Sequence, residues 1–340
     1  MSKRKITVIP GDGIGPSIIE SAIQILTHAG CDFDYDYADA GLVALEKHGE
    51  LLPQATLDLI EKNKVSLKGP LTTPVGGGFT SINVSLRKKF NLYANVRPVI
   101  SFKGTRSRYD NIDIITVREN TEGMYSGAGQ KRSDDNQSAE AMSIITRDGA
   151  ERIVTFAFEL ARQEGRKKVT IIHKANILKS TSGLFLEVAR EVAARYPDIQ
   201  NEEMIVDAAC MNLVMYPERF DVMVTTNLFG DILSDLNAGL VGGLGMAPAG
   251  NIGTDAAIFE AVHGSAPDIA GKGLANPSAL LLAAAMMLEH LGWNAAAEMI
   301  VAGIEAAIAD KVVTYDFARL MEGAHEVKTS EFAQAVVDRM

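Results

Sequence analysis

Residues 5–29 read KITVIPGDGIGPSIIESAIQILTHA, and this stretch decides the fold class. The β-rich run at 5–9 ends at a Pro-Gly turn, and apolar residues then recur at helical spacing over 16–29. Further β-rich runs at 65–68, 112–117, 169–172 and 221–225 alternate with helical spacing at 151–164, 183–195 and 231–241. Strands that alternate with helices along the whole chain predict an α/β protein with a largely parallel sheet.

The composition is that of a globular protein with more acidic than basic residues. The chain has 340 residues, of which 47% are hydrophobic and 22% charged, which excludes a disordered chain. The length predicts two closely packed domains. Lys and Arg number 33 against 43 Asp and Glu, a net charge of −10. That charge disfavours nucleic-acid or anionic-membrane partners, although it leaves room for a local basic pocket.

Cysteine content and hydropathy indicate the compartment. Cys31 and Cys210 are too few for a disulfide framework or a cysteine zinc site, and they suit a reducing cytoplasm. The first ten residues, MSKRKITVIP, run into a strand and lack the apolar core of a signal peptide. The longest apolar run, 279–288, is about half of what would span a bilayer. We therefore expect a soluble cytoplasmic protein with no contact with membranes.

Two glycine-rich stretches resemble phosphate-binding loops but lack their spacing. Residues 11–15 (GDGIG) lie between a strand and a helix, where a dinucleotide fingerprint would be, but they read G-x-G-x-G and precede Pro16. Residues 76–78 (GGG) lack the Lys-Ser/Thr pair of an NTPase loop. Neither motif identifies the function.

Three arginines on separate predicted elements, Arg87, Arg97 and Arg118, indicate a site for carboxylates. They lie beside Gly-rich or strand-end sequence, together with Ser81 and Asn83. A single arginine on a helix face is usually solvated. Three in so acidic a chain suggest convergence, because the planar guanidinium binds a carboxylate through two hydrogen bonds, which lysine cannot do.

Asp231 and Asp235 form a candidate metal site. If residues 231–241 are helical, the i, i+4 spacing places both carboxylates on one face, where they can share a divalent cation. Two acids near the start of a helix also fit ordinary charge–dipole placement, so that alternative stays open. Asp207 is a candidate third ligand, and an all-oxygen set would select Mg²⁺ or Mn²⁺ over zinc.

Three further side chains are candidates for chemistry. Lys174 directly follows the β-rich residues 169–173 and is either a surface lysine or a group that exchanges protons with a substrate. Tyr125 carries a hydroxyl that can donate a proton. His263 opens a run of small residues whose backbone amides can approach a ligand, although a lone histidine is more often structural. None of the three is decisive by itself.

Taken together, the motifs cover essentially the whole chain in a consistent order. They are LTTPVGGG (71–78), SIN (81–83), LR (86–87), NVRP (95–98), RENTEG (118–123), HKAN (173–176), NLFGDILSD (227–235) and HGSAPDIAGKGLANP (263–277). This set resembles the metal-dependent β-decarboxylating dehydrogenases, which include isocitrate, 3-isopropylmalate, homoisocitrate and tartrate dehydrogenases. So many motifs in one order would hardly occur by chance.

The resemblance implies an architecture that the residues alone do not. It implies a two-domain α/β fold of the isocitrate/isopropylmalate dehydrogenase type, distinct from the Rossmann fold, with the active-site cleft between the domains. Residues 1–97 and 251–340 would form the large cofactor-binding domain, and 98–250 the small domain. The Gly-, Ser- and Asp-rich segment 124–137 reads by itself as an exposed loop or arm. By the resemblance it clasps a second subunit in a homodimer or larger assembly, in which Lys174 and Asp207 are contributed across the dimer.

The resemblance also assigns roles to individual residues. The implied catalytic residues are Tyr125 and Lys174. The implied substrate-binding residues are Ser81, Asn83, Arg87, Arg97 and Arg118, and the implied metal ligands are Asp207, Asp231 and Asp235. The implied cofactor-binding residues are Thr73, Asn176, His263, Gly264, Asp268, Ile269 and Asn276. The implied reaction is oxidative decarboxylation of isocitrate to 2-oxoglutarate and CO₂, with Lys174 assisting removal of the 2-hydroxyl proton and Tyr125 protonating carbon after CO₂ leaves.

The choice of substrate depends on Ser81 and Asn83, which precede Leu-Arg as in the isocitrate enzymes and can hydrogen-bond the extra carboxylate of isocitrate. The isopropylmalate enzymes present apolar residues here, and a polar pocket rejects an analogue that leaves its groups unpaired. Thr80, where many isocitrate enzymes carry Arg, leaves homoisocitrate open as a secondary substrate. The same chemistry on homoisocitrate, 3-isopropylmalate or tartrate is the nearer alternative. A non-catalytic regulatory subunit is the rival of a different class, but such subunits typically lose a catalytic or metal residue, and all of these are present.

The choice of cofactor depends on Asp268 and Ile269. Asp268 can accept hydrogen bonds from the adenosine ribose and would repel a 2′-phosphate, whereas NADP-using relatives carry Lys and Tyr at these positions. A conflicting signal comes from Tyr315 and Arg319, which stand where NADP-specific relatives bind the phosphate. We expect the carboxylate to dominate and NAD to be the cofactor.

Overall fold

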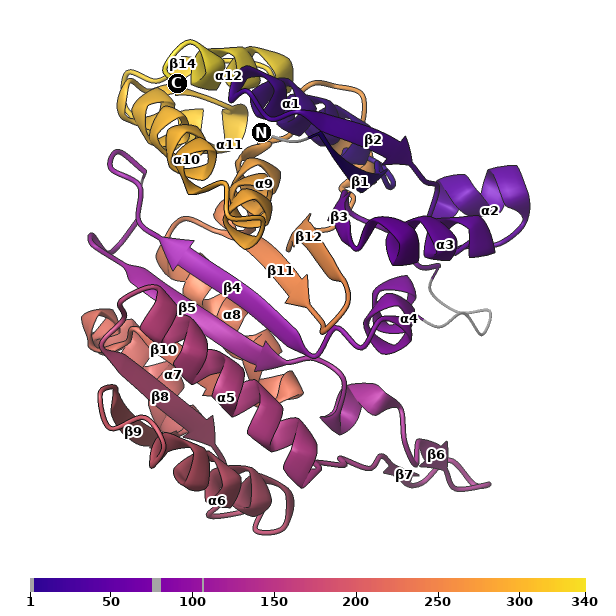
Figure 1. The fold of residues 1–340 in the computed structure, drawn as a ribbon, viewed down its shortest axis with the longest axis vertical. Helices are drawn as coiled ribbons and strands as arrows, with labels where there is room; N and C mark the ends of the chain where they lie inside the picture. The colour runs from indigo at the N-terminus through magenta and orange to yellow at the C-terminus, as the bar shows by residue number, and fades with distance from the viewer. Residues whose placement is uncertain (1–2, 75–80, 106) are drawn as a thin grey trace.

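The structure of the chain is a computed structural model that describes residues 3–74, 81–105 and 107–340 (Figure 1). In that part of the chain, ten strands form one sheet in the order β2-β1-β3-β12-β11-β4-β5-β10-β8-β9. Their bounds are β1 (Arg4–Ile9), β2 (Phe33–Tyr37), β3 (Val65–Lys68), β4 (Ala94–Ile100), β5 (Asp113–Glu119), β8 (Lys168–His173), β9 (Gln200–Ile205), β10 (Val222–Thr225), β11 (Pro248–Ile252) and β12 (Ala257–Ala261).

The sheet consists of two parallel halves that run in opposite directions. β2, β1, β3 and β12 are parallel neighbours, and so are β5, β10, β8 and β9. Between the halves, β11 pairs antiparallel with both β12 and β4, and β4 pairs antiparallel with β5. The largely parallel sheet predicted above therefore holds within each half only. The reason is that β11–β12 and β4–β5 follow one another along the chain without a crossover helix, and parallel neighbours need one.

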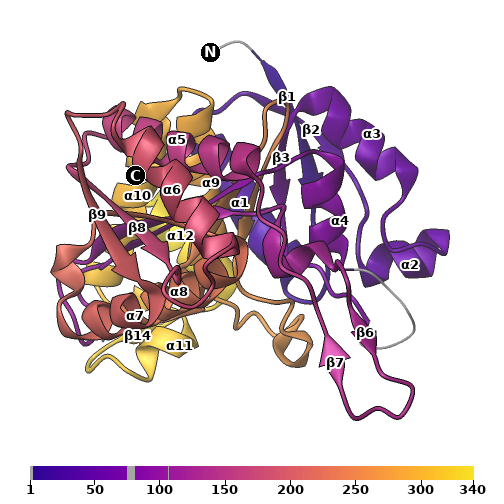
Figure 2. The same cartoon turned by 90° about the horizontal axis from the view of Figure 1, so that it is seen from below.

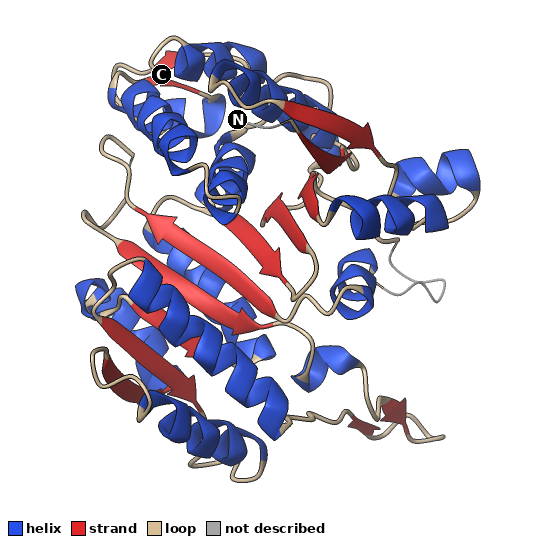
Figure 3. Cartoon of the chain, in the orientation of Figure 1, coloured by secondary structure: helices blue, strands red, loops and turns tan. Residues whose placement is uncertain are grey.

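The helices cover both faces of each half of the sheet (Figure 3). The α-helices are α1 (Gly15–His28), α2 (Leu42–His48), α3 (Gln54–Asn63), α4 (Ile82–Lys89), α5 (Arg147–Gln163), α6 (Thr181–Ala193), α7 (Val206–Met215), α8 (Asn227–Leu240), α9 (Ser278–His290), α10 (Asn294–Ala309), α11 (Tyr315–Ala318) and α12 (Thr329–Val337). Short 3₁₀ turns are η1 (Gly123–Ser126), η2 (Pro217–Arg219), η3 (Leu244–Met246) and η4 (Pro267–Ile269).

Successive side chains of a strand point to opposite faces of the sheet, so each face of the sheet has its own apolar core. Val222 and Val224 on β10 pack with α5 and α6, whereas Met223 between them packs with α7 and α8. In the other half, α1, α9, α10 and α12 enclose the largest apolar core against β1, β3 and β12. The apolar run 279–288 lies inside α9 and is buried there except for the half-buried Met286. None of the described helices is both long and apolar enough to cross a membrane.

The two ends of the chain lie together in one half of the molecule, and the middle of the chain forms the other half (Figure 1). Helix α1 contacts α12 there. Strand β4 packs in the middle half, where Ala94 and Val96 join the core beneath α5 and Val99 joins the core beneath α7 and α8. Phe102, two residues after the strand, joins the core beneath α9. The domain limits expected at 97/98 and 250/251 stay a prediction.

The segment 124–137, predicted to be an exposed loop or arm, carries the first strand of a short antiparallel hairpin that continues to residue 140. Its strands are β6 (Lys131–Arg132) and β7 (Ala139–Glu140), and their residues are exposed. Figure 2 shows the hairpin extending away from the body of the molecule. The exposure expected from composition is therefore confirmed, whereas contact of this arm with a second subunit stays a prediction. The remaining strand pair is β13 (Val312–Val313) with β14 (His325–Glu326).

Candidate active site

Arg118 occupies a buried position between β5 and α8. Its side chain is 1% exposed, and it donates two hydrogen bonds to Asn227 Oδ1, at 3.1 and 2.8 Å, and pairs with Asp231. Gly230 makes this packing possible, since a Cβ on that residue would lie 2.5 Å from the Cγ of Arg118. Position 230 within NLFGDILSD therefore has to be glycine, because the Arg118 side chain packs directly against it.

Arg97 on β4 is buried beside the same helix. Its Nε donates to Asn95 Oδ1 at 2.7 Å and its Nη1 to Ser234 Oγ at 2.6 Å. Its terminal nitrogens lie 3.5 Å from Asp231 and 3.6 Å from Asp235. Burial, reinforced by the charge of Arg118, lowers the pKa of Arg97 to about 10, so the group stays protonated at neutral pH.

Arg87 and Asn83 on α4 each carry a polar atom that has no partner in the described part of the chain. Arg87 Nε and Asn83 Oδ1 are both buried, and neither has a hydrogen-bond partner among the described residues. Both side chains line a small cavity together with Lys68 and Glu260. Burial lowers the pKa of Arg87, and Arg118, Asp231 and Tyr125 are close enough to act on it. Buried polar atoms in proteins are nearly always paired, so these two are suited to a polar ligand.

Ser81 is exposed at the N-cap of α4, and its side chain makes no capping bond. Thr80, the departure noted in the sequence, lies outside the described residues, as does the glycine run at 76–78. The structure therefore brings Arg87, Arg97 and Arg118 together and leaves Ser81 at the margin of the cluster.

Tyr125 in η1 joins the arginine cluster through Asp231. Its hydroxyl donates to Asp231 Oδ2 at 2.5 Å, and the Arg118 guanidinium lies 5.0 Å from the centre of its ring. Burial, followed by the contact with the Asp231 carboxylate, raises the pKa of Tyr125 above its usual 10. The phenol therefore keeps its proton at neutral pH and is available as a proton donor.

The three acids expected to bind a metal are not brought together within one chain. Asp231 and Asp235 lie one turn apart on α8 beside the arginines, whereas Asp207, in the first turn of α7, pairs with Lys174. Within the described residues, no group of three or more His, Cys, Asp or Glu side chains could hold a metal ion. The side chain of Asp207 is 69% exposed, so it is accessible to another molecule.

The chemistry of these acids nevertheless fits a divalent cation. The hydrogen bond from Lys174 lowers the pKa of Asp207. Burial by itself would raise the pKa of Asp231, but the charge of Arg118 and the hydrogen bond from Tyr125 outweigh it, and the net pKa is lowered. Both carboxylates are ionised at neutral pH and offer the oxygen ligands that Mg²⁺ and Mn²⁺ prefer.

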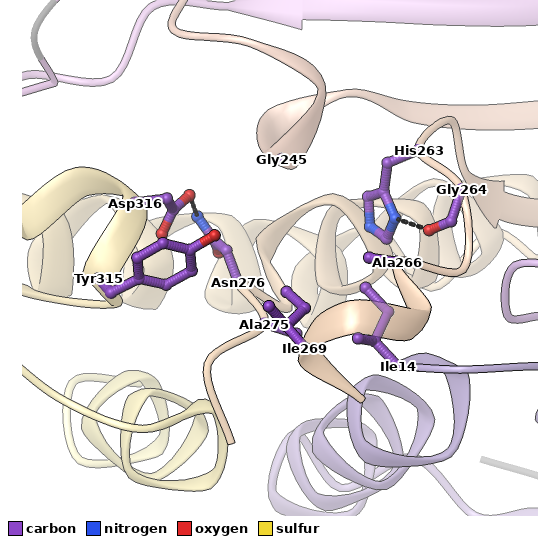
Figure 4. Close-up of a pocket in the computed structure, with 10 residues that line it drawn as sticks. All are labelled: Ile14, Gly245, His263, Gly264, Ala266, Ile269, Ala275, Asn276, Tyr315 and Asp316. Carbon is purple, nitrogen blue, oxygen red and sulfur yellow. Dashed lines mark hydrogen bonds between the residues drawn. The ribbon is translucent and has the colours of Figure 1, made fainter. Parts of the chain in front are cut away.

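A separate pocket of about 420 Å³ lies in the other half of the molecule (Figure 4). It contains four of the seven predicted cofactor residues, namely His263, Gly264, Ile269 and Asn276. The remaining lining residues are Ile14, Gly245, Ala266, Ala275, Tyr315 and Asp316. Thr73, Asn176 and Asp268 are not among the residues that line it, although Asp268 immediately precedes Ile269 in η4.

His263 presents a free nitrogen in this pocket. Its Nδ1 donates to the carbonyl oxygen of Gly264 at 3.0 Å, because a carbonyl can only accept. Burial lowers the pKa of His263 below its usual 6.5, so the ring is neutral at pH 7. Its Nε2 is therefore an acceptor, and this buried atom has no partner among the described residues. A buried acceptor of this kind suits a ligand that offers a hydrogen-bond donor, such as an amino or hydroxyl group.

Asp316 is a pocket residue that the sequence did not indicate. Its Oδ2 accepts a hydrogen bond from Asn276 at 3.0 Å, and Tyr315 beside it lines the same pocket (Figure 4). The guanidinium of Arg319 lies 5.7 Å from the centre of the Tyr315 ring. In the sequence, the only indication of a role for Asp316 was its position next to Tyr315, which was considered for cofactor binding.

The GDGIG loop contributes to this pocket although its spacing is not that of a Rossmann fingerprint. Ile14 lines the pocket, and its amide donates to the carbonyl of Ser265 at 2.9 Å. Gly13 has a φ of +59°, and a Cβ there would lie 2.0 Å from the same carbonyl. The glycine lets the loop pack directly against residues 263–268.

Comparison with known proteins places the chain in a family. The family model described as isocitrate/isopropylmalate dehydrogenase matches residues 5–336. The chain belongs to this family. A solved structure of isocitrate dehydrogenase from Methylococcus capsulatus has a TM-score of 0.94 to this family member and is 55% identical to it, with 99% of each chain covered.

Curated relatives carry names for two different substrates. A Drosophila melanogaster protein named probable NAD isocitrate dehydrogenase subunit alpha, mitochondrial, is 46% identical over 99% of this chain and 88% of its own. The 3-isopropylmalate dehydrogenase of Archaeoglobus fulgidus is 49% identical over 98% of both chains. The chain is thus a decarboxylating dehydrogenase with the two-domain α/β fold of its family, and identity alone does not separate the two substrates.

Proposed function

We propose that this dehydrogenase catalyses the NAD-dependent oxidative decarboxylation of isocitrate to 2-oxoglutarate and CO₂, with Mg²⁺ or Mn²⁺ as the metal. The observation that carries the proposal is the group of three arginines around Asp231, in which Arg87 Nε is buried and has no partner among the described residues. Converging guanidinium groups with free donors suit a substrate that bears several carboxylates.

The polar character of α4 supports isocitrate over 3-isopropylmalate. The buried Asn83 Oδ1 has no partner among the described residues, and Ser81 stands at the start of the same helix. An isopropyl group placed here would leave the buried Asn83 Oδ1 unpaired, at about 1–3 kcal/mol. A third carboxylate would accept from the amide nitrogen of Asn83 and from the hydroxyl of Ser81, and a water bound to that carboxylate would donate to Asn83 Oδ1.

The reaction follows from the protonation states in the cluster. Arg87, Arg97 and Arg118 hold the carboxylates, and Lys174 assists removal of the 2-hydroxyl proton as hydride leaves that carbon for NAD. A divalent cation between Asp231, Asp235 and Asp207 would polarise the substrate oxygens. Tyr125 keeps its proton at neutral pH and delivers it to the carbon from which CO₂ has departed.

The proposal includes a second copy of the chain. Lys174 and Asp207 pair with each other, and within the described part of one chain they form no metal site with the acids on α8. Large apolar side chains are also exposed on α7 and α8, and these are Met211, Val214, Met215, Leu228 and Ile232. Exposed apolar surface of this kind marks interaction sites. We therefore propose a homodimer, or a larger assembly built from it, in which Lys174 and Asp207 of one copy serve the site of the other.

NAD is the proposed cofactor because carboxylates stand in and beside the pocket of His263. Asp316 lines it, and Asp268 lies at its margin in η4. Either carboxylate would repel a 2′-phosphate.

The cytoplasmic location inferred from the two cysteines also stays a proposal, with both thiols free in the structure.

Initial rates test the proposal directly. Purified protein with Mg²⁺ is assayed with isocitrate, homoisocitrate and 3-isopropylmalate, each with NAD and with NADP, and with EDTA as the metal-free control. We expect the highest kcat/KM for isocitrate with NAD and loss of the rate in EDTA. For Asn83→Leu, we expect kcat/KM for isocitrate to fall by about tenfold or more, from the lost hydrogen bond to a charged group. A higher kcat/KM for 3-isopropylmalate in the wild type would overturn the substrate assignment, and faster turnover with NADP would overturn the cofactor assignment.

A further inference from the structure

Three buried asparagines meet at the centre of the sheet, and the proposed reaction does not use them. Asn251 on β11 lies opposite Asn95 on β4, and Asn120 directly follows β5. Their exposed fractions are 2%, 0% and 3%. Asn251 Oδ1 accepts one hydrogen bond from the side-chain amide of Asn95 and another from that of Asn120, both at 3.0 Å.

The other end of the Asn251 side chain faces a charged pair. Its Nδ2 donates to Glu260 Oε1 at 2.7 Å and to the carbonyl of Ile258 at 3.3 Å. Glu260 on β12 forms a 2.5 Å ion pair with Lys68 on β3. Burial by itself would raise the pKa of Glu260, but the charges of Lys68 and Arg87 outweigh it, and the net pKa is lowered. Glu260 is therefore ionised at neutral pH.

The charge on Glu260 sets the direction of every hydrogen bond that follows. An ionised carboxylate can only accept, so Asn251 turns its amino group toward Glu260 and its oxygen toward Asn95. Asn95 must then donate to that oxygen, which turns its own oxygen toward Arg97 Nε, 2.7 Å away. A row of hydrogen bonds thus leads from Lys68 across four neighbouring strands to the arginine cluster.

We propose that Asn251 is a positioning residue for Arg97, which it orients through the amide of Asn95. With Nε held by Asn95 Oδ1, the terminal nitrogens of Arg97 lie toward Ser234, Asp231 and Asp235, on the side where a substrate carboxylate would bind. Without Asn251, the amino group of Asn95 loses the acceptor that fixes this side chain, so Asn95 is free to rotate and holds Arg97 Nε less firmly. The name of the substrate rests on the proposed function, whereas the orientation of Arg97 does not.

A double-mutant cycle tests the proposal. Asn251→Ser keeps a small polar side chain but removes the bridge between Glu260 and Asn95. We expect KM and the calorimetric Kd for isocitrate to rise about tenfold, with kcat and the KM for NAD changed by less than about twofold, because one hydrogen bond to a charged group loses its alignment. In an Arg97→Lys background, which lacks the Nε–H, Asn251→Ser should change the Kd by less than about twofold.

Asn63→Ser is the matched control, since Asn63 is also a buried asparagine, but it bonds Thr7 and Asp36 away from the arginines. We expect it to leave KM unchanged. Should Asn251→Ser fail to fold, Asn95→Ser removes the acceptor of Arg97 Nε directly and must raise KM in the same way. An unchanged KM in the folded variant, or an equal rise in the Arg97→Lys background, overturns the proposal. A wild type that binds and oxidises 3-isopropylmalate but not isocitrate refutes the proposed function alone, and the same cycle is then measured with that acid.

Discussion

At the scale of single residues, the protonation state of His263 should affect ligand binding in the pocket that it lines. Its Nε2 is a buried acceptor with no partner in the described part of the chain, and its Nδ1–H is held by Gly264. Burial, the main cause, keeps the pKa of His263 below 6.5, so the folded state disfavours the protonated ring. Protonation of the ring would turn Nε2 from a hydrogen-bond acceptor into a donor, and a donor group of the ligand could no longer pair with it.

The affinity for NAD should therefore depend on pH with a definite sign. We expect the Kd for NAD to stay constant from about pH 8 to 7 and to rise once the pH falls below 6.5, through the lowered pKa of His263. Calorimetric titrations from about pH 8 to 5.5 measure this. The same residue contributes folding stability that is present above the unfolded pKa of about 6.5 and is lost as the pH falls through the folded pKa.

Two variants make this test specific. His263→Gln should abolish the pH dependence of the Kd, whereas His28→Gln, at the exposed end of α1, should retain it. An equal pH dependence in His263→Gln and the wild type would show that another group controls cofactor binding.

At the scale of elements, the start of α5 is tied to the segment that carries Tyr125. Thr146 is the N-cap residue of α5, and its hydroxyl accepts from the amide of Gly149 at 3.0 Å. The same hydroxyl donates to Glu122, whose carboxylate also accepts from the Thr146 amide at 2.9 Å. Glu122 is the residue immediately before η1. The cap therefore anchors both the helix and the approach to the active site.

Removing the hydroxyl should destabilise the fold by a measurable amount. We expect Thr146→Ala to lower the free energy of unfolding by about 1 kcal/mol, which is typical of a lost N-cap, and Thr146→Ser to restore most of it. The midpoints and slopes of urea unfolding give these values. Thr27→Ala is the control, because the Thr27 hydroxyl donates to the carbonyl of Ile23 within α1 and does not cap the start of a helix. An equal loss in both alanine variants would contradict a capping role for Thr146.

At the scale of the whole molecule, the position of Lys174 is the informative observation. Lys174 follows β8 and pairs with Asp207 at the start of α7, while Tyr125 and Asp231 lie in the arginine cluster. The described part of a single chain does not unite these two groups into a metal site. A two-fold dimer would bring each pair to the other copy.

Mixing inactive variants tests that arrangement. Tyr125→Phe and Lys174→Met should each be nearly inactive as homodimers, whereas co-refolded mixtures should recover about a quarter of the wild-type activity. With equal amounts of the two variants, half of the dimers contain one chain of each. In such a dimer one of the two active sites has both Tyr125 and Lys174 unchanged. Mixing Tyr125→Phe with Asp231→Asn should recover nothing, because both residues come from the same chain. Equal recovery in the two mixtures, or none in the first, would refute a shared site.

The fold elements that the sequence predicted well are those with local periodicity. The helix expected over 16–29 is α1, and the β-rich runs at 65–68 and 169–172 are β3 and β8. The start of α8 was missed, because Gly230 weakens the helical pattern over 227–230. Packing of Arg118 against that glycine outweighs its low propensity. Local patterns carry no information about such a contact.

The alternation of strands and helices and the motifs that indicate the family could be read from the sequence, because both depend on short segments. The roles that the resemblance gives to the candidate site residues stay predictions. The reversal of the sheet at β11 and β4, and the meeting of Asn251 with Asn95 and Asn120 beside Arg97, became visible in the folded chain alone. Asp316 likewise enters the pocket only through the fold. The physical reason is that strand order brings together side chains far apart in sequence, and their hydrogen bonds depend on mutual orientation rather than on local pattern.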